Sequence, residues 1–299
     1  MSGGPDSIAL LLLANAAFPG QVFATTVDHG LRCESAAEAA FVARLCGDMG
    51  LSHETVAVAV EAGNVQDRAR TARYRALYRS FEERGVFTIA TAHHADDQAE
   101  TLLMRLARGS GIAGLAGVRA RRVEFGEQGG EYLLLRPLLH WRRDELAQVV
   151  AAAGIEPVRD PSNEDERFDR VRIRRFLAEN DWLDPLALAR SAQHLQEAED
   201  TVNEAVASVY NRFVSHEGDT TWFQPGHPRL VEVEVVRAIL EKYGAPPDRS
   251  AIAKMCDQLC HDGHATLAGV AARRAWYRKE PRLTVDSWRF DPAPPRNTG

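Results

Sequence analysis

The first half of the chain alternates between short apolar runs and longer stretches with helical spacing of apolar residues. The short runs are rich in β-branched and aromatic residues and predict strands at Gln21–Val27, Glu54–Val60 and Val86–Thr91. The amphipathic stretches predict helices at Ser7–Ala17, Ser35–Met49, Gln66–Arg84 and Asp96–Ala107. Because strands that alternate with helices form parallel sheets, the pattern predicts an α/β domain with a doubly wound parallel sheet.

The pattern then becomes less regular. A glycine-rich, charged turn at Gly126–Glu131 separates the runs Arg119–Phe125 and Tyr132–Leu135, which predicts a β-hairpin. Two further helical patterns follow at Arg142–Ala153 and Arg167–Glu179.

Long helical periodicity marks the second half, over Asp184–Val214, Val231–Tyr243 and Ala251–Leu259, whereas Ala265–Val285 carries β-branched and aromatic residues. A chain of 299 residues is long enough for two domains. We expect a first domain over residues 1–181, a mainly helical second domain over residues 182–290, and a disordered, proline-rich tail over residues 291–299.

Charge is distributed unevenly. The net charge of −6 argues against a uniformly basic nucleic-acid coat. Arginines nevertheless gather in three clusters, around residues 68–79, 105–122 and 167–175, while acidic residues gather after residue 197. Each cluster alone could be a solvated helix face, but together they predict that the N-terminal half faces a polyanion.

The cysteines and the apolar runs indicate the cellular compartment in which the protein works. The four cysteines form no Cys-x-x-Cys pair, and the longest apolar run, Ile8–Ala14, is far shorter than the roughly 20 residues of a membrane span. We expect a reduced, cytoplasmic protein with no membrane partner.

The segment Ser2-Gly3-Gly4-Pro5-Asp6-Ser7 stands directly before the first predicted helix. Its glycines let an anion approach the backbone, and its hydroxyl groups can donate hydrogen bonds, so a pyrophosphate would fit at this helix N-terminus. Asp6 could be a helix-capping carboxylate or could lie on the side of a bound Mg²⁺. Taken alone, such a turn is also typical of a disordered N-terminus.

A second polar segment, His93-His94-Ala95-Asp96-Asp97-Gln98-Ala99-Glu100-Thr101, follows the third predicted strand. The carboxyl ends of parallel strands are where α/β active sites lie, so the cluster could carry out acid–base chemistry. The alternative is that Asp96 and Asp97 are helix-start acids and His93 an ordinary loop residue.

These two segments, together with Val27–Arg32, Asn64–Tyr78, Asp160–Asn163 and Phe168–Arg174, resemble in composition and order the tRNA(Ile)-lysidine synthetases of the PP-loop ATP pyrophosphatase family, in their short form. The resemblance implies an adenine nucleotide alpha hydrolase-like domain that uses ATP and Mg²⁺. It further implies that the wobble cytidine of an isoleucine tRNA with a CAU anticodon is adenylated at its C2 oxygen, and that the amine of L-lysine then displaces AMP to give lysidine.

The resemblance also assigns roles to residues. ATP would be held by Ser2, Gly3, Gly4, Pro5, Asp6, Ser7, Asp28 and His29. The catalytic residues would be Asp97, which contacts the cytosine, and His93 and Glu100, which support it. The residues that meet the substrate or tRNA would be Arg70, Arg73, Arg170, Arg172 and Arg174. The sequence leaves a homodimer open as the oligomeric state.

One feature departs from the family pattern. The family's loop follows a buried first strand, but only Met1 precedes Ser2, so this strand is missing and we expect the natural chain to begin upstream with an apolar β segment. Two other functions remain as alternatives: another PP-loop chemistry such as tRNA cytidine thiolation, whose enzymes usually need cluster cysteines, and a non-catalytic tRNA-binding protein.

Overall fold

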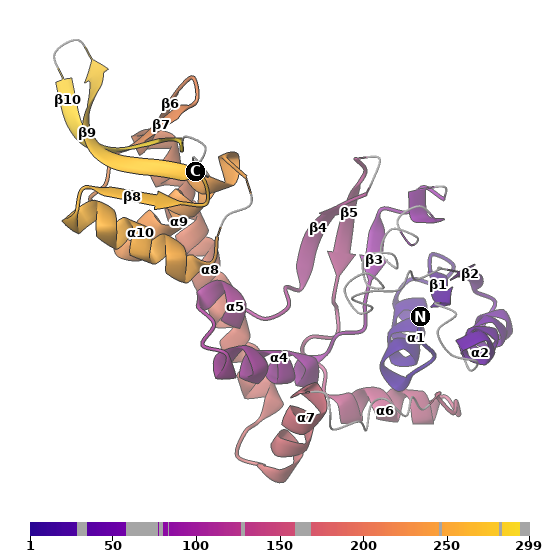
Figure 1. The fold of residues 1–299 in the computed structure, drawn as a ribbon. Helices are drawn as coiled ribbons and strands as arrows, with labels where there is room; N and C mark the ends of the chain where they lie inside the picture. The colour runs from indigo at the N-terminus through magenta and orange to yellow at the C-terminus, as the bar shows by residue number, and fades with distance from the viewer. Residues whose placement is uncertain are drawn as a thin grey trace, which may run out of the picture. The chain divides into compact units, whose positions relative to one another are not determined.

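The computed structural model describes residues 1–28, 35–57, 77, 80–82, 84–126, 129–158, 169–244, 247–280 and 283–293 (Figure 1). The chain forms two compact units, Met1–Gln196 and Glu197–Gly299. The boundary between these units falls inside a long helix, α8 (Pro185–Phe213). The first turns of α8 belong to the N-terminal unit because Ala192 is fully buried there and Gln196 Nε2 donates to Ala116 O at 2.6 Å.

The N-terminal unit is an α/β domain. Its strands are β1 (Phe23–Asp28), β2 (Ser52–Ala57), β3 (Thr88–Ala90), β4 (Arg121–Phe125) and β5 (Glu131–Leu135). Its helices are α1 (Pro5–Ala17), α2 (Ser35–Asp48), α4 (Ala95–Ala107), α5 (Ile112–Leu115), α6 (Arg143–Ala152) and α7 (Asp169–Glu179). Strand β1 pairs with β2, and β3 with β5, in parallel, as the alternating sequence pattern predicts.

The predicted hairpin is present as β4 and β5, which pair antiparallel. The hairpin is part of a larger sheet, because β5 also pairs with β3 and the strand order is β3-β5-β4. Within the described residues, β1 and β2 form a separate two-stranded piece. The amino group of Met1 donates to Thr25 O in β1.

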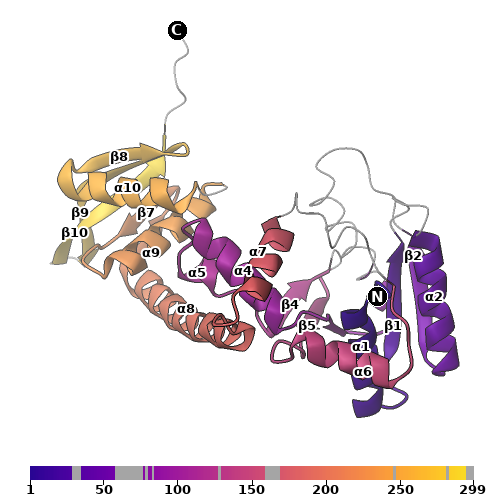
Figure 2. The same cartoon turned by 90° about the horizontal axis from the view of Figure 1, so that it is seen from below.

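Helices pack on these strands through apolar faces. Ile8 and Ala9 of α1 are fully buried against Leu146 and Val150 of α6. Helix α2 lies along β1 and β2 (Figure 2), and Val42 and Cys46 are fully buried in that contact. Leu11 of α1 packs with Ala24 of β1 and Val42 of α2. Because burial of each large aliphatic side chain contributes about 1.5 to 3 kcal/mol, these contacts hold α1 against the strand.

The C-terminal unit corrects the expectation of a mainly helical domain. Helices α9 (Arg229–Lys242) and α10 (Arg249–His261) accompany five strands: β6 (Val214–Glu217), β7 (Thr220–Phe223), β8 (His264–Leu267), β9 (Val270–Glu280) and β10 (Leu283–Pro292). The strands form one antiparallel sheet in the order β6-β7-β10-β9-β8. Three of the strands have only four residues, too few for an alternating pattern to stand out from the helical pattern beside it.

The first residues of the expected disordered tail belong to a strand. Asp291 and Pro292 continue β10, where they pair with Ala271 and Val270. The apolar residues Trp288 and Phe290 on the same strand are buried and anchor it. Residues 294–299 lie outside the described part of the chain.

In the described residues, no helix is both long enough and apolar enough to cross a membrane.

Candidate active site

The segment Ser2–Ser7 forms a tight turn into α1. Gly3 has φ +72°, a conformation that L side chains rarely adopt, and a Cβ there would lie 3.1 Å from Val158 Cγ2 and 3.3 Å from Val42 Cγ2. The carbonyl of Gly3 accepts a hydrogen bond from Val158 N at 2.9 Å. A side chain at this position would therefore be strained by the backbone conformation and crowded by Val158 and Val42.

Pro5 occupies the first turn of α1, where its missing N–H costs nothing. Ser7 Oγ donates to Gly4 O at 3.0 Å, and Ser2 Oγ lies 3.3 Å from Ser7 Oγ. The two hydroxyl groups thus flank the start of the helix, where the helix dipole favours an anion.

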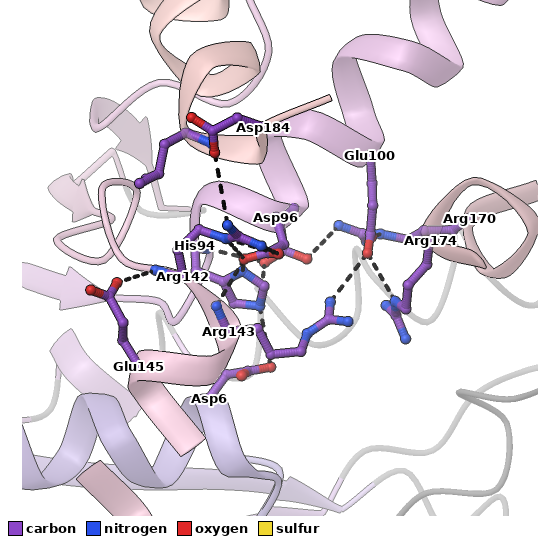
Figure 3. Close-up of polar contacts among 12 residues, drawn as sticks. Asp6, His94, Asp96, Glu100, Arg142, Arg143, Glu145, Arg170, Arg174 and Asp184 are labelled. Carbon is purple, nitrogen blue, oxygen red and sulfur yellow. Dashed lines mark hydrogen bonds and ion pairs between the residues drawn. The ribbon is translucent and has the colours of Figure 1, made fainter. Parts of the chain in front are cut away.

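A buried histidine connects this turn to the second polar segment (Figure 3). His94, directly before α4, is 1% exposed. Its Nε2 lies 3.6 Å from Asp6 Oδ2 and 3.5 Å from Asp97 Oδ2, and its Nδ1 lies 3.5 Å from Asp96 Oδ2. These separations are those of ion pairs rather than well-aligned hydrogen bonds.

The charge of His94 follows from these neighbours. Burial alone would lower the pKa of the imidazole, but Asp6, Asp96 and Asp97 together raise it to about 9. At neutral pH the ring is therefore a buried cation among three carboxylates, one from the N-terminal turn and two from α4.

Glu100 forms the second centre of the site. Its carboxylate is 1% exposed and accepts hydrogen bonds from Arg143 Nη2 at 3.1 Å, Arg170 Nε at 2.7 Å and Arg174 Nε at 2.9 Å. Burial would raise the pKa of Glu100, but Arg174 and Arg170 hold it below its ordinary value. Helix α7 thereby docks on α4 through charge (Figure 3).

Asp96 is held from α6. The backbone N–H of Arg143 donates to Asp96 Oδ2 at 2.8 Å, and Arg142 Nη2 donates to Asp96 Oδ1 at 3.2 Å. Despite burial, these contacts and His94 keep the pKa of Asp96 well below its usual range. Asp96 therefore stays ionised and orients the histidine.

The structure brings most of the predicted catalytic residues together. Asp97 accepts hydrogen bonds from Arg170 Nη2 at 2.8 Å and from His94 N at 3.1 Å, so it lies between the histidine and the arginines. Glu100 lies one turn further along α4 and shares Arg170 with Asp97. His93 points differently, since its Nδ1 lies 3.0 Å from Thr91 Oγ1.

The other predicted residues are spread more widely. Asp28 ends β1, and Arg172 pairs with Asp169 at the surface. Arg170 and Arg174 point inward at carboxylates rather than outward. His29, Arg70 and Arg73 lie outside the described residues.

Sequence reasoning missed four residues that the geometry makes central: His94, Asp96, Arg142 and Arg143. His94 and Asp96 were in the recognised segment, but its spacing does not tell which of two adjacent histidines is buried. Arg142 and Arg143 carry only a weak signal, a pair of arginines at a helix start with Glu145 shortly after; in the structure Arg142 N donates to Glu145 Oε2 at 2.7 Å.

Comparison with known proteins identifies the family. The profile of the PP-loop domain family matches residues 1–180. A tRNA(Ile)-lysidine synthase from Novosphingobium aromaticivorans is 44% identical over 98% of this chain and 88% of its own length. Another, from Zymomonas mobilis, is 38% identical over 99% of this chain and 88% of its own length. The chain belongs to the tRNA(Ile)-lysidine synthase family.

A solved structure supports the fold of this lysidine synthase family member. The U34-tRNA thiolase NcsA from Methanococcus maripaludis, solved with its [4Fe-4S] cluster, superposes with a TM-score of 0.53 at 17% identity, over 66% of this chain and 71% of that one. At this identity the likeness shows a shared PP-loop α/β fold. The α/β class expected from the sequence is thus confirmed.

Proposed function

We propose that this protein ligates L-lysine to C2 of the wobble cytidine of the isoleucine tRNA that carries a CAU anticodon, using ATP. An adenylated tRNA would form first, and lysine would then displace AMP, giving lysidine, AMP and pyrophosphate and switching decoding from methionine to isoleucine. One observation carries the proposal beyond family membership: the Ser2–Ser7 turn and the α4 segment meet at His94, which lies 3.6 Å from Asp6 and 3.5 Å from Asp97.

The proximity of the Ser2–Ser7 turn to the α4 segment matters because the reaction joins two substrates. The nucleotide's phosphates would lie at the α1 N-terminus, against Gly3, Gly4 and the hydroxyls of Ser2 and Ser7. Asp28 and His29 would face the adenine. The reacting base would lie beside Asp97, and the α-phosphate must come within bonding distance of it. His94 is a cation between these two places, so it would favour negative charge that develops at the phosphate.

The residues also fit a magnesium ion. Asp6 Oδ1 is buried and makes no hydrogen bond within the described part of the chain, while Oδ2 faces His94. A carboxylate oxygen that is withdrawn from bulk water beside a phosphate site suits Mg²⁺, which takes one or two carboxylates together with substrate phosphates. When bound, Mg²⁺ would neutralise phosphate charge, and Asp6 would be its protein ligand.

The arginines would divide into two groups. Arg170 and Arg174 would position Glu100 and Asp97, because their guanidinium groups already bind these carboxylates. Arg172, together with Arg70 and Arg73, would contact tRNA. Thr91 would orient His93 at the edge of the site. We further propose that the protein works in the cytoplasm and as a homodimer.

The decisive experiment offers ATP, radiolabelled lysine and the CAU isoleucine tRNA, and measures label in the tRNA. We expect label to enter only when ATP is present, with AMP and pyrophosphate released. A protein that binds ATP and this tRNA but transfers no label is not a lysidine synthase.

Asp97→Asn is the matching variant test. It keeps the shape of the side chain and one oxygen but removes the charge, so lysine transfer should fall by at least about a hundredfold while tRNA affinity changes little. An equal loss of tRNA affinity would mean that Asp97 acts on tRNA binding rather than on the reacting base.

A further inference from the structure

Three helices of the N-terminal unit begin near Arg142 (Figure 3). At the start of α4, Ala95 N donates to Trp141 O at 2.9 Å, shortly before α6 begins. Arg142 Nη1 lies 3.8 Å from Oδ1 of Asp184, the residue that precedes α8. Since α4 carries the proposed catalytic residues, contacts at this junction can fix their position relative to α6 and α8.

Asp96 of α4 caps α6. Arg142, which directly precedes α6, has no acceptor in its side chain, so the first N–H groups of this helix need a partner from elsewhere. Asp96 Oδ2 supplies it by accepting from Arg143 N at 2.8 Å. The same oxygen lies 3.5 Å from His94 Nδ1. The carboxylate that faces the buried histidine therefore also joins the start of α4 to the start of α6.

The guanidinium group of Arg142 binds the same carboxylate through two nitrogens. Nε donates to Asp96 Oδ1 at 3.3 Å and to Oδ2 at 3.4 Å, and Nη2 donates to Oδ1 at 3.2 Å. Side-chain exposure is 33% for Arg142 and 15% for Asp96, so water screens this pair less than it screens a surface pair. A contact through two nitrogens fixes the rotation of the Asp96 side chain as well as its distance.

Asp184 faces the third nitrogen of the guanidinium group, Nη1. Asp184 is itself held in place, because Oδ1 accepts from Leu186 N at 3.0 Å and Oδ2 accepts from Ala187 N at 3.1 Å. These are the contacts of a helix N-cap, so the carboxylate moves with the first turn of α8. Arg142 is thus held between two carboxylates, one from the start of α4 and one from the start of α8.

We infer that Arg142 is a positioning residue for the proposed reaction: it holds Asp96, and through Asp96 the imidazole of His94, in place relative to the first turn of α8. The inference rests on the proposed function and extends it to Asp184, a residue outside the site that holds Arg142. Because the reacting atoms must be closely aligned, a small rotation of His94 should slow lysine transfer and leave ATP binding almost unchanged.

A direct contact with tRNA is the other role that a partly exposed arginine could have. The contacts of Arg142 favour positioning, because all three guanidinium nitrogens already face carboxylates of this chain. The two roles also differ in their kinetics. Loss of a positioning residue lowers kcat, whereas loss of a phosphate contact raises the KM for tRNA and changes its salt dependence.

The test measures kcat and KM of lysine transfer in variants of Arg142. Arg142→Met keeps an unbranched side chain without charge, so kcat should fall at least about tenfold while KM for ATP and tRNA stays within about twofold of the wild type. Arg142→Lys restores the charge but not the contact through two nitrogens, so it should recover part of the lost rate.

A variant of Asp184 tests the contact with α8. Asp184→Asn keeps the cap of α8, because asparagine caps a helix as well as aspartate does, but it removes the charge, so kcat should fall about threefold. Asp248→Asn is the matched control and should leave kcat unchanged, since Asp248 caps α10 in the same way, through Ser250 N and Ala251 N. Adding Asp184→Asn to Arg142→Met should lower kcat no further, because the group that Asp184 holds is gone.

Urea unfolding gives a second reading that needs no substrate. The unfolding constant of the double variant R142M/D184N should be at least about twofold smaller than the product of the two single effects predicts, whereas the effects in R142M/D248N should multiply. Multiplied effects in both pairs would overturn the link between Arg142 and α8.

Three kinetic results would also overturn the inference: an unchanged kcat in Arg142→Met, a raised KM for tRNA with kcat unchanged, or a further threefold loss when Asp184→Asn is added. Failure of the proposed function looks different, because the wild type itself would then place no label in the tRNA. Label with the wild type and an unchanged kcat in Arg142→Met contradict only the inference.

Discussion

At the scale of single residues, His94 makes stability depend on pH. Its folded pKa of about 9 lies above the ordinary value of 6.5, so the protonated ring stabilises the fold fully below pH 6.5 and this contribution disappears as the pH rises through 9. Its contacts are longer than hydrogen bonds, so we expect the effect to be about 2 kcal/mol.

The measurement is urea unfolding of wild type and His94→Gln at several pH values. The difference in unfolding free energy between the wild type and His94→Gln should decrease as the pH rises from 6.5 to 9. His140→Gln, which alters an exposed histidine, is the control and should follow the wild type at each pH. A difference that stays constant with pH would show that the carboxylates do not hold the proton on His94.

Glu100 carries a second prediction about a single side chain. Glu100→Gln leaves Arg143, Arg170 and Arg174 around a neutral group, so we expect unfolding to become easier by about 3 kcal/mol. Glu179→Gln removes one partner of the exposed pair with Arg175 and should cost less than about 0.5 kcal/mol. Thermal unfolding of both variants compares them, and equal effects would contradict a structural role for the buried carboxylate.

Chemistry and order along the chain were enough to single out two polar segments from the sequence, but not to tell which of their side chains are buried. The Ser2–Ser7 turn and the α4 segment were both recognised, and the structure joins them through Asp6, His94 and Asp97. The sequence could not tell that His94 rather than His93 is buried, because the side chains of adjacent residues outside a regular helix or strand have no predictable orientation toward the core. The roles of Arg142 and Arg143 depend on α6 packing beside α4, a long-range contact with no local signature.

At the scale of elements, the turn into α1 can be tested by a pair of glycines with the same backbone conformation. Gly3 has φ +72°, and a Cβ added to it would meet side chains at 3.1 to 3.4 Å, whereas Gly20 has φ +73° and a Cβ there would meet nothing within 4 Å. Gly20→Ala should cost only the strain of a left-handed alanine, about 1 kcal/mol. Gly3→Ala adds a steric displacement of the turn from Val158 and Val42, and should cost about 1 kcal/mol more.

The same pair separates binding from stability. If the Ser2–Ser7 turn holds the phosphates, Gly3→Ala should weaken ATP binding about tenfold or more, and Gly20→Ala should leave it unchanged. Isothermal titration with ATP measures both. Unchanged ATP affinity in Gly3→Ala would place the nucleotide elsewhere.

Element prediction was best where a periodic pattern runs over many residues. Helices α1, α2, α4 and α6 begin and end close to the predicted positions because each has an apolar face that is buried. Helix α7 also does so, although none of its residues is buried and it contacts α4 through ion pairs. Strands β6, β7 and β8 were missed because a strand in a small antiparallel sheet is stabilised by its neighbours across the sheet, which sequence spacing does not reveal.

At the scale of the whole molecule, arginines of the same cluster differ in their exposure and in the groups that they contact. The cluster of α7 was expected to face tRNA, yet Arg170 and Arg174 bind carboxylates of α4. Charge counted along a sequence cannot separate an arginine that neutralises its own protein from one that remains for a partner. Among the three arginines of α7 assigned to tRNA, Arg172 is the most exposed, at 65% of its side chain.

This division predicts how each arginine affects tRNA binding. Arg172→Ala should weaken tRNA binding and reduce the slope of log affinity against log salt by about 0.7 to 0.9, the value of one lost phosphate contact, with no loss of folding stability beyond about 0.5 kcal/mol. Arg174→Ala should instead lower the unfolding temperature, because Glu100 loses a buried partner. Arg229→Ala is a matched control, since Arg229 is 61% exposed and also pairs with an aspartate, Asp257. Filter binding across a salt series, with thermal unfolding of each variant, tests both predictions. If the salt slope changes equally for Arg172→Ala and Arg229→Ala, only the net charge of the protein affects binding. If the slope is unchanged in Arg172→Ala, this residue does not contact tRNA phosphates.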